Sequence, residues 1–133
     1  KLNLDYFQIY GNYNDKKISE IKSKYKKKII SALQIKNKKD ILNYKNVEKF
    51  ADIILWDSSG LEQSVSWKYD WIKSISGNFS KMIAGNLNID KLEIISKLAD
   101  IVDVSGALET NKVKDINKIV KFLEEIKKIN DKN

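Results

Sequence analysis

Ala51-Asp52-Ile53-Ile54-Leu55-Trp56 is a nearly continuous apolar run that ends in the polar turn Asp57-Ser58-Ser59-Gly60. A short apolar run bounded by turn residues is typical of a strand that is covered on both faces, as the strands of parallel sheets are. Parallel neighbours need a crossover between them, and that crossover is usually a helix. The run therefore predicts an α/β fold, and the sequence on both sides follows the pattern that such a fold requires.

Strand and helix patterns alternate along the chain. Short apolar or aromatic runs are followed by segments in which apolar residues recur at helical spacing among Lys and Glu. The predicted strands are residues 5–10, 28–33, 51–56, 80–84 and 100–104. The predicted helices are residues 15–24, 39–50 and 69–76, a helix that begins at Asn88 or Asp90, and residues 115–129, with a loop over residues 61–68.

This alternation predicts a parallel sheet with right-handed crossovers. Two architectures satisfy it, an open doubly wound sheet and an arc of a (β/α)₈ barrel, and periodicity does not distinguish them. Both architectures bind their ligands at the carboxyl ends of the strands. The residues that follow each predicted strand are therefore the first place to look for chemistry.

Composition excludes several classes of site. The chain has 133 residues, the size of one ordinary domain, and a globular balance of 42% hydrophobic and 32% charged residues. It contains no Cys and no His, which excludes disulfides, thiolate sites, His-based metal sites and Ser-His-Asp triads within this chain. A general acid or base must be a carboxylate, Lys or Tyr. No apolar run approaches the roughly 20 residues that a membrane span needs.

The net charge is +7, and all 25 basic residues are Lys. Such a charge is compatible with a polyanion-binding protein, but it also arises when Lys coats the solvent faces of helices. Proteins that read nucleic acids usually rely on Arg, which this chain lacks. The second interpretation is favoured, and no nucleic-acid or membrane partner is predicted.

Four residues at predicted strand ends are candidates for function. Asp57 ends the apolar strand, where it could act as an acid or could cap the Ser58-Ser59-Gly60 turn. Gly85 and Gly106 follow the last two strands, where small residues either form turns or let backbone N–H groups approach an anion. Asp103 lies within its strand and is either a hydrogen-bonded structural residue or a group near a site.

Five motifs, in the order and spacing of one family, resemble those of the phosphoribosylanthranilate isomerases. The most extensive match is ADIVDVSGALE at residues 99–109, which resembles the family's VDVSSGVE and continues into TNKVKD, similar to ESPGVKD. The other four motifs are MIAGNLN at 82–88, similar to LAGGLN, ILWDS at 54–58, similar to LLDS, YDW at 69–71, similar to FDW, and YFQIYG at 6–11, similar to VQLHG.

The resemblance implies a (β/α)₈ TIM barrel and begins at the family's strand four. Residues 1–133 would then form the C-terminal portion of a single barrel domain, covering about its last five βα units. The first three strands would have to come from elsewhere. We expect the chain to associate with an N-terminal part of the barrel, or with itself through exposed sheet edges.

The resemblance also implies an activity in tryptophan biosynthesis, in the cytoplasm, with a phosphosugar substrate and without cofactor or metal. N-(5-phosphoribosyl)anthranilate would be converted to 1-(2-carboxyphenylamino)-1-deoxyribulose 5-phosphate by an Amadori rearrangement. Asp57 matches the family's acid, whereas the family's Cys base lies in the absent part, so this chain alone should be inactive. Asp103 matches an Asp near the reacting centre. The residues that match the phosphate-binding backbone are Gly85, Asn86, Ser105, Gly106 and Ala107.

The chain departs from the family pattern at several of these positions. Tyr10 replaces a His, Asn86 replaces the second Gly of AGGL, and residues 61–68 replace a Gly-rich stretch. Ala107 stands where the family has Gly and would be strained if a positive φ were required there. Two other functions remain open: a non-catalytic half-barrel that binds phosphosugars or serves as an assembly unit, and a Lys-rich polyanion binder.

Overall fold

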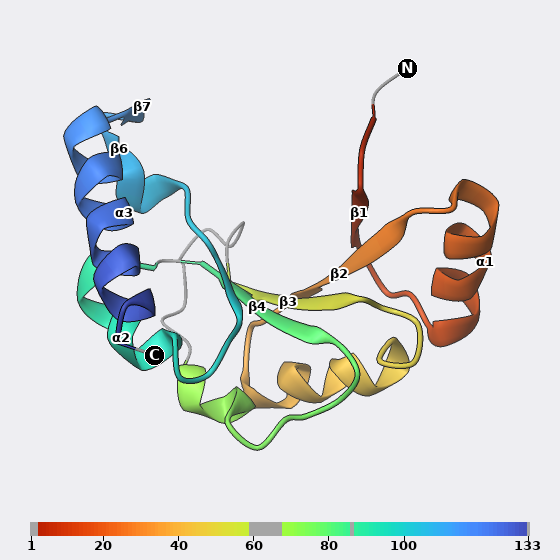
Figure 1. Cartoon of the computed structure of the whole chain (residues 1–133). Helices are drawn as coiled ribbons and strands as arrows, with labels where there is room; N and C mark the ends of the chain where they lie inside the picture. Colours follow the sequence, from red (N-terminus) through yellow and green to blue (C-terminus); the bar gives the residue numbers. More distant parts are fainter. Residues whose placement is uncertain (1–2, 59–67, 86, 133) are drawn as a thin grey trace.

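The computed structural model describes residues 3–58, 68–85 and 87–132 and shows a curved parallel sheet with helices on its outer face (Figure 1). The sheet strands are β1 (Tyr6–Tyr10), β2 (Lys28–Gln34), β3 (Ile53–Asp57), β4 (Ser80–Ala84) and β5 (Ile101–Asp103). The α-helices are α1 (Asp15–Tyr25), α2 (Leu92–Ile95) and α3 (Ile116–Asn130). Four 3₁₀ helices and a small hairpin complete the described part: η1 (Lys38–Asn46), η2 (Tyr69–Ile72), η3 (Ile89–Lys91), η4 (Gly106–Leu108), β6 (Glu109–Thr110) and β7 (Val113–Lys114).

The strand order decides between the two predicted architectures. The five strands lie in the order β1-β2-β3-β4-β5, and every neighbouring pair is parallel. A doubly wound sheet reverses its strand order and carries helices on both faces. Here the order never reverses, and the described helices lie along the convex side of the sheet (Figure 1). The sheet is therefore an arc of a barrel, and the open doubly wound alternative is wrong.

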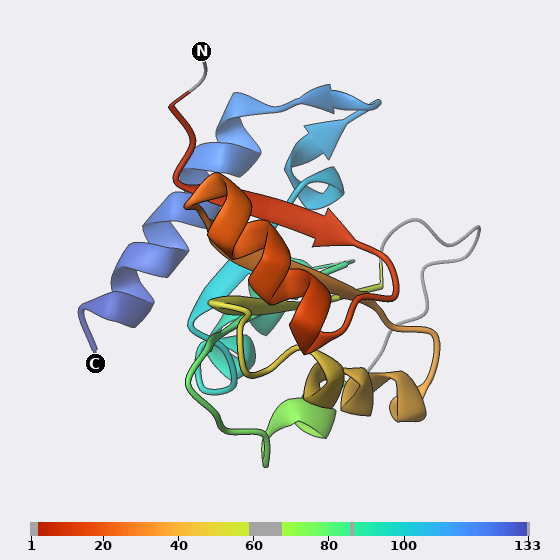
Figure 2. The same cartoon turned by 90° about the vertical axis from the view of Figure 1, so that its right-hand side faces the viewer.

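The main core lies between the convex face of the sheet and the helices. Trp56 on β3 is fully buried there, its indole N–H donates to the backbone carbonyl of Ile41 at 3.3 Å, and its ring packs edge-on against Tyr44. Ile18 on α1 and Ile83 on β4 belong to the same cluster. From the side, α1 lies over β1 and β2 (Figure 2). The helices fold back onto this face because their apolar residues have no other surface to bury against.

The concave face carries rows of side chains set by the strand register. Ala32, Leu55 and Ala84 form a second, smaller buried cluster on this face. Because all five residues of β3 are buried, the strand is covered on both faces, as its continuous apolar sequence predicts. Layers of inward-pointing side chains from neighbouring strands are how barrel interiors are filled.

Two aspartates tie strands together at their amino ends. Asp52, just before β3, accepts from the backbone N–H of Ile29 at 2.8 Å and pairs with the Lys22 ammonium at 2.9 Å. Asp100, just before β5, accepts from the backbone N–H of Lys81 at 2.8 Å. Both follow an alanine in the sequence and precede an isoleucine, and both accept from the N–H of the second residue of the preceding strand. These bonds sit opposite the carboxyl ends and stabilise the sheet.

The sheet has two edges. β1 pairs with β2 alone and β5 pairs with β4 alone, so within the described residues the arc is not closed. An unpaired edge exposes a row of backbone donors and acceptors that another strand can pair with.

The hairpin β6–β7 was not predicted from the sequence. Its two-residue turn is Asn111-Lys112, with φ values of 53° and 65°. A tight hairpin turn of this kind needs positive φ at both central residues, and glycine is the usual signal for it. Lys gives no such signal. The predicted helices over 39–50 and 69–76 are also shorter than expected, since η1 ends at Asn46 and η2 at Ile72.

Replacing Asp52 by Ala should lower the free energy of unfolding by about 1–3 kcal/mol, because Ile29 loses its acceptor and Lys22 loses its partner. Asp52→Asn keeps an acceptor oxygen but no charge, so its free energy of unfolding should lie between those of the wild type and the Asp52→Ala variant. Urea denaturation measures the change. Asp90→Ala removes an exposed carboxylate at the start of η3 and should stay within about 0.5 kcal/mol of the wild type. Equal losses in the Asp52 and Asp90 variants would contradict the assigned role.

Candidate functional site

The register of the sheet brings two carboxylates to its carboxyl edge on the concave face. Asp57, the last residue of β3, is 4% exposed and pairs in register with Gln34 on one side and Ala84 on the other. Ala84 pairs in turn with Asp103, the last residue of β5. Residues in register point to the same face, so Asp57 on β3 and Asp103 on β5 both face the barrel interior, with β4 between them. Two of the predicted site residues are thus brought together.

Tyr10 joins this pair from β1. Its hydroxyl lies 3.5 Å from the Asp57 Oδ2 atom and accepts a hydrogen bond from the Gln8 side-chain amide at 2.8 Å. Burial raises the pKa of the Tyr10 hydroxyl, and the negative charge of Asp57 raises it further, with a smaller contribution from Asp103. The phenol therefore stays protonated at neutral pH and can donate to the Asp57 carboxylate. In the sequence, Tyr10 stands at the end of a predicted strand, where chemistry was expected, and departs from a family pattern, but its contact with Asp57 was not predicted.

Gly85 closes the strand end next to Asp57. Its φ is +91°, and a Cβ atom at this position would lie 2.2 Å from the Ser58 Oγ atom and 2.7 Å from the Ser58 backbone nitrogen. Only glycine fits this contact. Ser58 is completely buried, and within the described ranges its hydroxyl has no hydrogen-bond partner. The turn after β3 and the turn after β4 are thus packed directly against each other, while Asn86 lies outside the described residues.

The segment after β5 is exposed and more open. Gly106 has an ordinary φ, and a Cβ atom there would meet nothing within 4 Å. Ala107 also lacks a positive φ, so the condition under which it would be strained does not arise. Among described residues, the backbone N–H groups of Gly106 and Ala107 donate to no protein acceptor. Both residues are exposed and follow the strand that carries Asp103.

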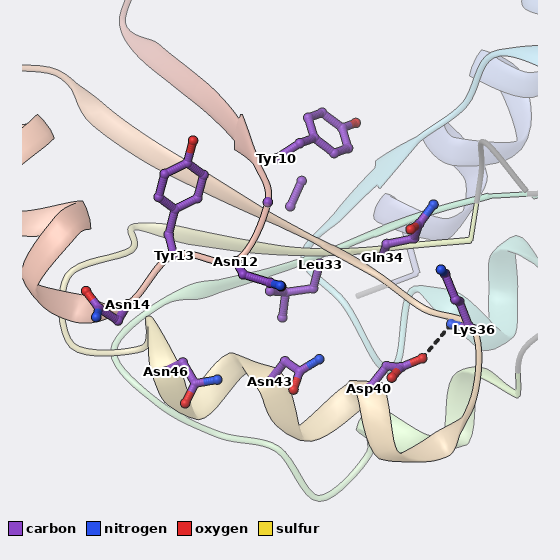
Figure 3. Close-up of a pocket in the computed structure, with 12 residues that line it drawn as sticks. Tyr10, Asn12, Tyr13, Asn14, Leu33, Gln34, Lys36, Asp40, Asn43 and Asn46 are labelled. Carbon is purple, nitrogen blue, oxygen red and sulfur yellow. Dashed lines mark hydrogen bonds between the residues drawn. The ribbon is translucent and has the colours of Figure 1, made fainter.

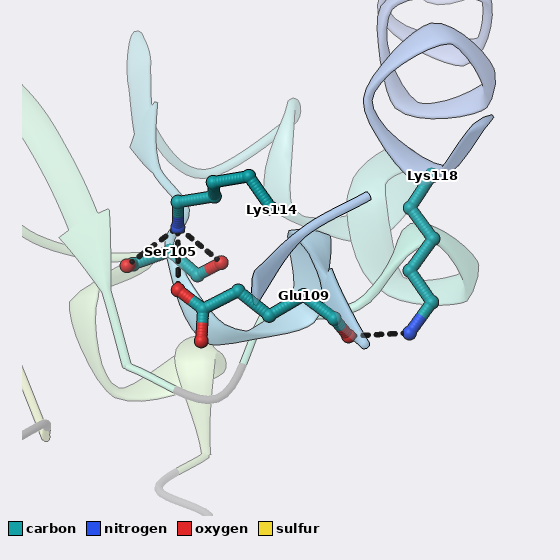
Figure 4. Close-up of polar contacts among 4 residues, drawn as sticks. All are labelled: Ser105, Glu109, Lys114 and Lys118. Atoms are coloured by element: carbon teal, nitrogen blue, oxygen red, sulfur yellow. Dashed lines mark hydrogen bonds and ion pairs between the residues drawn. The ribbon is translucent and has the colours of Figure 1, made fainter. Parts of the chain in front are cut away.

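A cluster of charged side chains braces this segment from the hairpin (Figure 4). The Lys114 ammonium donates to the Ser105 carbonyl oxygen at 3.1 Å, to the Ser105 hydroxyl at 3.1 Å and to the Glu109 carboxylate at 2.6 Å. Lys118 on α3 donates to the backbone carbonyl of Glu109. Neither lysine was among the predicted site residues. The only available signal was the alignment of residues 110–115 with a family motif.

A cleft of about 850 Å³ opens beside Tyr10, between the loop after β1 and the helical turn η1 (Figure 3). Side-chain amides dominate its lining. Asp40, on its floor, accepts from the backbone N–H groups of Lys36 and Asn37 at 2.7 and 2.8 Å, which fixes that side of the cleft. The amides that line it come from Asn12, Asn14, Gln34, Asn43 and Asn46. The sequence did not predict this cleft, because its lining residues come from β1, β2, η1 and the loops after β1 and β2, which are brought together only in the fold.

The described residues include no cluster of three or more acidic side chains suited to a metal ion. None of the helices found among them is long and apolar enough to cross a bilayer.

Comparison with known proteins identifies one family. The family model for N-(5'-phosphoribosyl)anthranilate isomerase matches residues 1–125. Two curated relatives, the N-(5'-phosphoribosyl)anthranilate isomerases of two Campylobacter jejuni strains, are 35% and 36% identical over 86 residues, which is 61% of this chain and 42% of each relative. The chain therefore spans well under two thirds of the relatives that it matches.

Solved structures of the same enzyme share the fold. The phosphoribosylanthranilate isomerase of Thermotoga maritima superposes with a TM-score of 0.75 at 24% identity, over 93% of this chain and 62% of that one. The Pyrococcus furiosus enzyme gives a TM-score of 0.69 at 21% identity, with the same coverage. A third structure holds the reduced form of 1-(o-carboxyphenylamino)-1-deoxyribulose 5-phosphate and gives a TM-score of 0.72. These likenesses confirm the predicted TIM-barrel fold.

Substitution of the two glycines at adjacent strand ends should change the free energy of unfolding by very different amounts. Gly85→Ala should lower the free energy of unfolding by about 2 kcal/mol or more, because the new Cβ atom meets Ser58 and the positive φ disfavours any side chain. Gly106→Ala, the matched control, should change it by less than about 0.5 kcal/mol, because the space is open. Thermal or urea denaturation distinguishes them. Similar losses for both variants would show that Gly85 is not under this constraint.

Proposed function

The chain belongs to the N-(5'-phosphoribosyl)anthranilate isomerase family, and we propose that it supplies the acid and the phosphate-binding loops of such an isomerase. We further propose that residues 1–133 form the C-terminal portion of one barrel domain. The family match over residues 1–125 and the five-stranded arc support this assignment. A closed barrel of this type has eight strands, so a segment with three more would complete it.

The proposed reaction converts N-(5-phosphoribosyl)anthranilate to 1-(2-carboxyphenylamino)-1-deoxyribulose 5-phosphate. Asp57 gives a proton to the ribose ring oxygen while the bond from C1 to that oxygen breaks, which leaves a Schiff base between C1 and the anthranilate nitrogen. A base then removes the proton on C2, and the resulting enolamine takes up a proton at C1 while its C2 hydroxyl loses a proton, which gives the ketone. No oxidant, metal or cofactor enters this balance.

The single observation that carries the proposal is the setting of Asp57. Its side chain is almost fully buried at the carboxyl edge of β3, on the face that a barrel turns inward. Catalytic groups of TIM barrels come from this edge. The Tyr10 hydroxyl beside it, and Asp103 on β5 across β4, add polar groups near the reacting centre.

The phosphate group is proposed to bind at the ends of β4 and β5, to backbone amides of Gly85-Asn86 and Ser105-Gly106-Ala107. Gly106 and Ala107 are exposed, and their N–H groups donate to no acceptor among the described residues, which supports this part of the proposal. Exposed backbone amides beside strand ends are suited to phosphate oxygens. A biosynthetic enzyme with this substrate is expected in the cytoplasm, with no nucleic acid or membrane partner.

The unpaired edges support a second candidate function. A half-barrel without catalysis could still bind phosphosugars or serve as an assembly unit, because β1 and β5 offer edges to another chain. The isomerase needs a catalytic base, whereas the non-catalytic half-barrel does not. The resemblance to the family implies a Cys base, which this chain lacks, so the isomerase candidate requires the complementary segment.

Turnover of N-(5-phosphoribosyl)anthranilate distinguishes the isomerase from the non-catalytic half-barrel. The 133-residue chain alone should show none, because it lacks the base. Combined with the N-terminal segment of a Campylobacter jejuni relative, which supplies the first three strands, it should gain activity. Turnover by the chain alone would overturn the assignment of the base. Assembly with phosphosugar binding but without turnover would favour the non-catalytic candidate.

In the assembled enzyme, Asp57→Asn should lower kcat by roughly 10²-fold or more and change KM far less, because the lost proton donor acts in the transition state. Steady-state kinetics measure both constants. Glu20→Gln, which changes an exposed carboxylate on α1 at the convex side of the sheet, should leave both within about twofold. If the Asp57 variant keeps wild-type kcat, Asp57 is not the acid.

A further inference from the structure

We propose that Lys114 is a positioning residue that holds the Ser105–Ala107 loop in the shape that receives a phosphate group. The inference rests on the proposed phosphate site and adds to it a residue whose side chain never contacts the ligand. Two observations support it: the hydrogen bonds that the Lys114 ammonium makes, and the β6–β7 hairpin that places Lys114 beside Ser105 (Figure 4).

The ammonium of Lys114 is fully engaged. A lysine has three N–H donors, and those of Lys114 meet three acceptors: the carbonyl oxygen of Ser105, its hydroxyl and the Glu109 carboxylate. Direct binding of a phosphate oxygen would break one of these bonds. The side chain instead clamps Ser105 from both its backbone and its side chain, directly before the exposed N–H groups of Gly106 and Ala107.

The hairpin is built so that Lys114 returns to this point. Glu109 on β6 and Lys114 on β7 are paired in register, and the turn between them places Asn111 and Lys112 in the left-handed region. Lys112 in that region costs on the order of 1–2 kcal/mol, whereas Asn adopts it more readily. Other bonds near the hairpin offset this cost, since the Asp115 N–H donates to the Leu108 carbonyl at 2.9 Å and the Thr110 hydroxyl to the Asp115 carboxylate at 2.7 Å.

Lys114 also cancels a charge that would oppose an anion. The Glu109 carboxylate lies two residues beyond the Ala107 N–H, where it would repel a phosphate group. The 2.6 Å ion pair with Lys114 neutralises it, and Lys118 holds the Glu109 backbone from the other side. Loss of Lys114 would both release Ser105 and leave Glu109 unpaired, so the loop would bind an anion less tightly for two reasons.

The test uses the full 133-residue chain with inorganic phosphate as the probe. Amide resonances of Gly106 and Ala107 report phosphate affinity by titration. Hydrogen exchange of the Leu108 amide, which donates to the Ser105 carbonyl oxygen at 3.0 Å, reports loop order without phosphate. Lys114→Met should weaken phosphate binding about tenfold and speed exchange at the Leu108 amide, in line with the loss of charged hydrogen bonds. Lys114→Arg keeps the charge and donors and should restore most of both properties.

Lys112→Met is the matched control. It removes the same charge from the same hairpin, from a side chain with no assigned contact among the described residues, and should change phosphate affinity by less than about twofold. Unchanged affinity in Lys114→Met, or equal weakening in both variants, overturns the inference. Weaker binding with unchanged amide exchange also overturns it, since Lys114 would then act through charge alone. Absence of saturable phosphate binding in the wild type refutes the proposed phosphate site itself.

Discussion

The parallel register of β3 with its two neighbours is the constraint on which the rest of the structure depends. It sets Gln34, Asp57, Ala84 and Asp103 in one row at the carboxyl edge of the sheet. A shift of one residue would turn Asp57 into the apolar core and Trp56 toward the barrel interior. The burial of Trp56 against the helices on the convex face therefore fixes where the Asp57 carboxylate points.

The two ends of the sheet have different tasks. At the amino ends, Asp52 and Asp100 satisfy backbone N–H groups of neighbouring strands and stabilise the arc. At the carboxyl ends, the turns after β3 and β4 pack so closely that Gly85 admits no side chain, and the loop after β5 is held by Lys114. This division of stability and chemistry between opposite ends is a general property of TIM barrels.

The sequence predicted the sheet well because its signals are local. The apolar run at β3 and the alternation around it predict each strand to within a few residues, and family motifs indicate a barrel rather than an open sheet. Two kinds of feature were not predictable. The turn at Asn111-Lys112 lacks the glycine that usually signals it. The contact of Tyr10 with Asp57 joins residues 47 positions apart, and the packing of Ser58 against Gly85 appears only when two strands pair.

The central claim is that this arc becomes an active barrel when three more strands pair with β1 and β5. A crystal structure of the chain assembled with a relative's N-terminal segment, bound to reduced 1-(o-carboxyphenylamino)-1-deoxyribulose 5-phosphate, tests it most directly. The account predicts a new strand beside each edge, the Asp57 carboxylate within about 3 Å of a ligand oxygen, and the phosphate at the Gly85 and Gly106 loops. A ligand bound away from Asp57, or edges that remain unpaired, would contradict it.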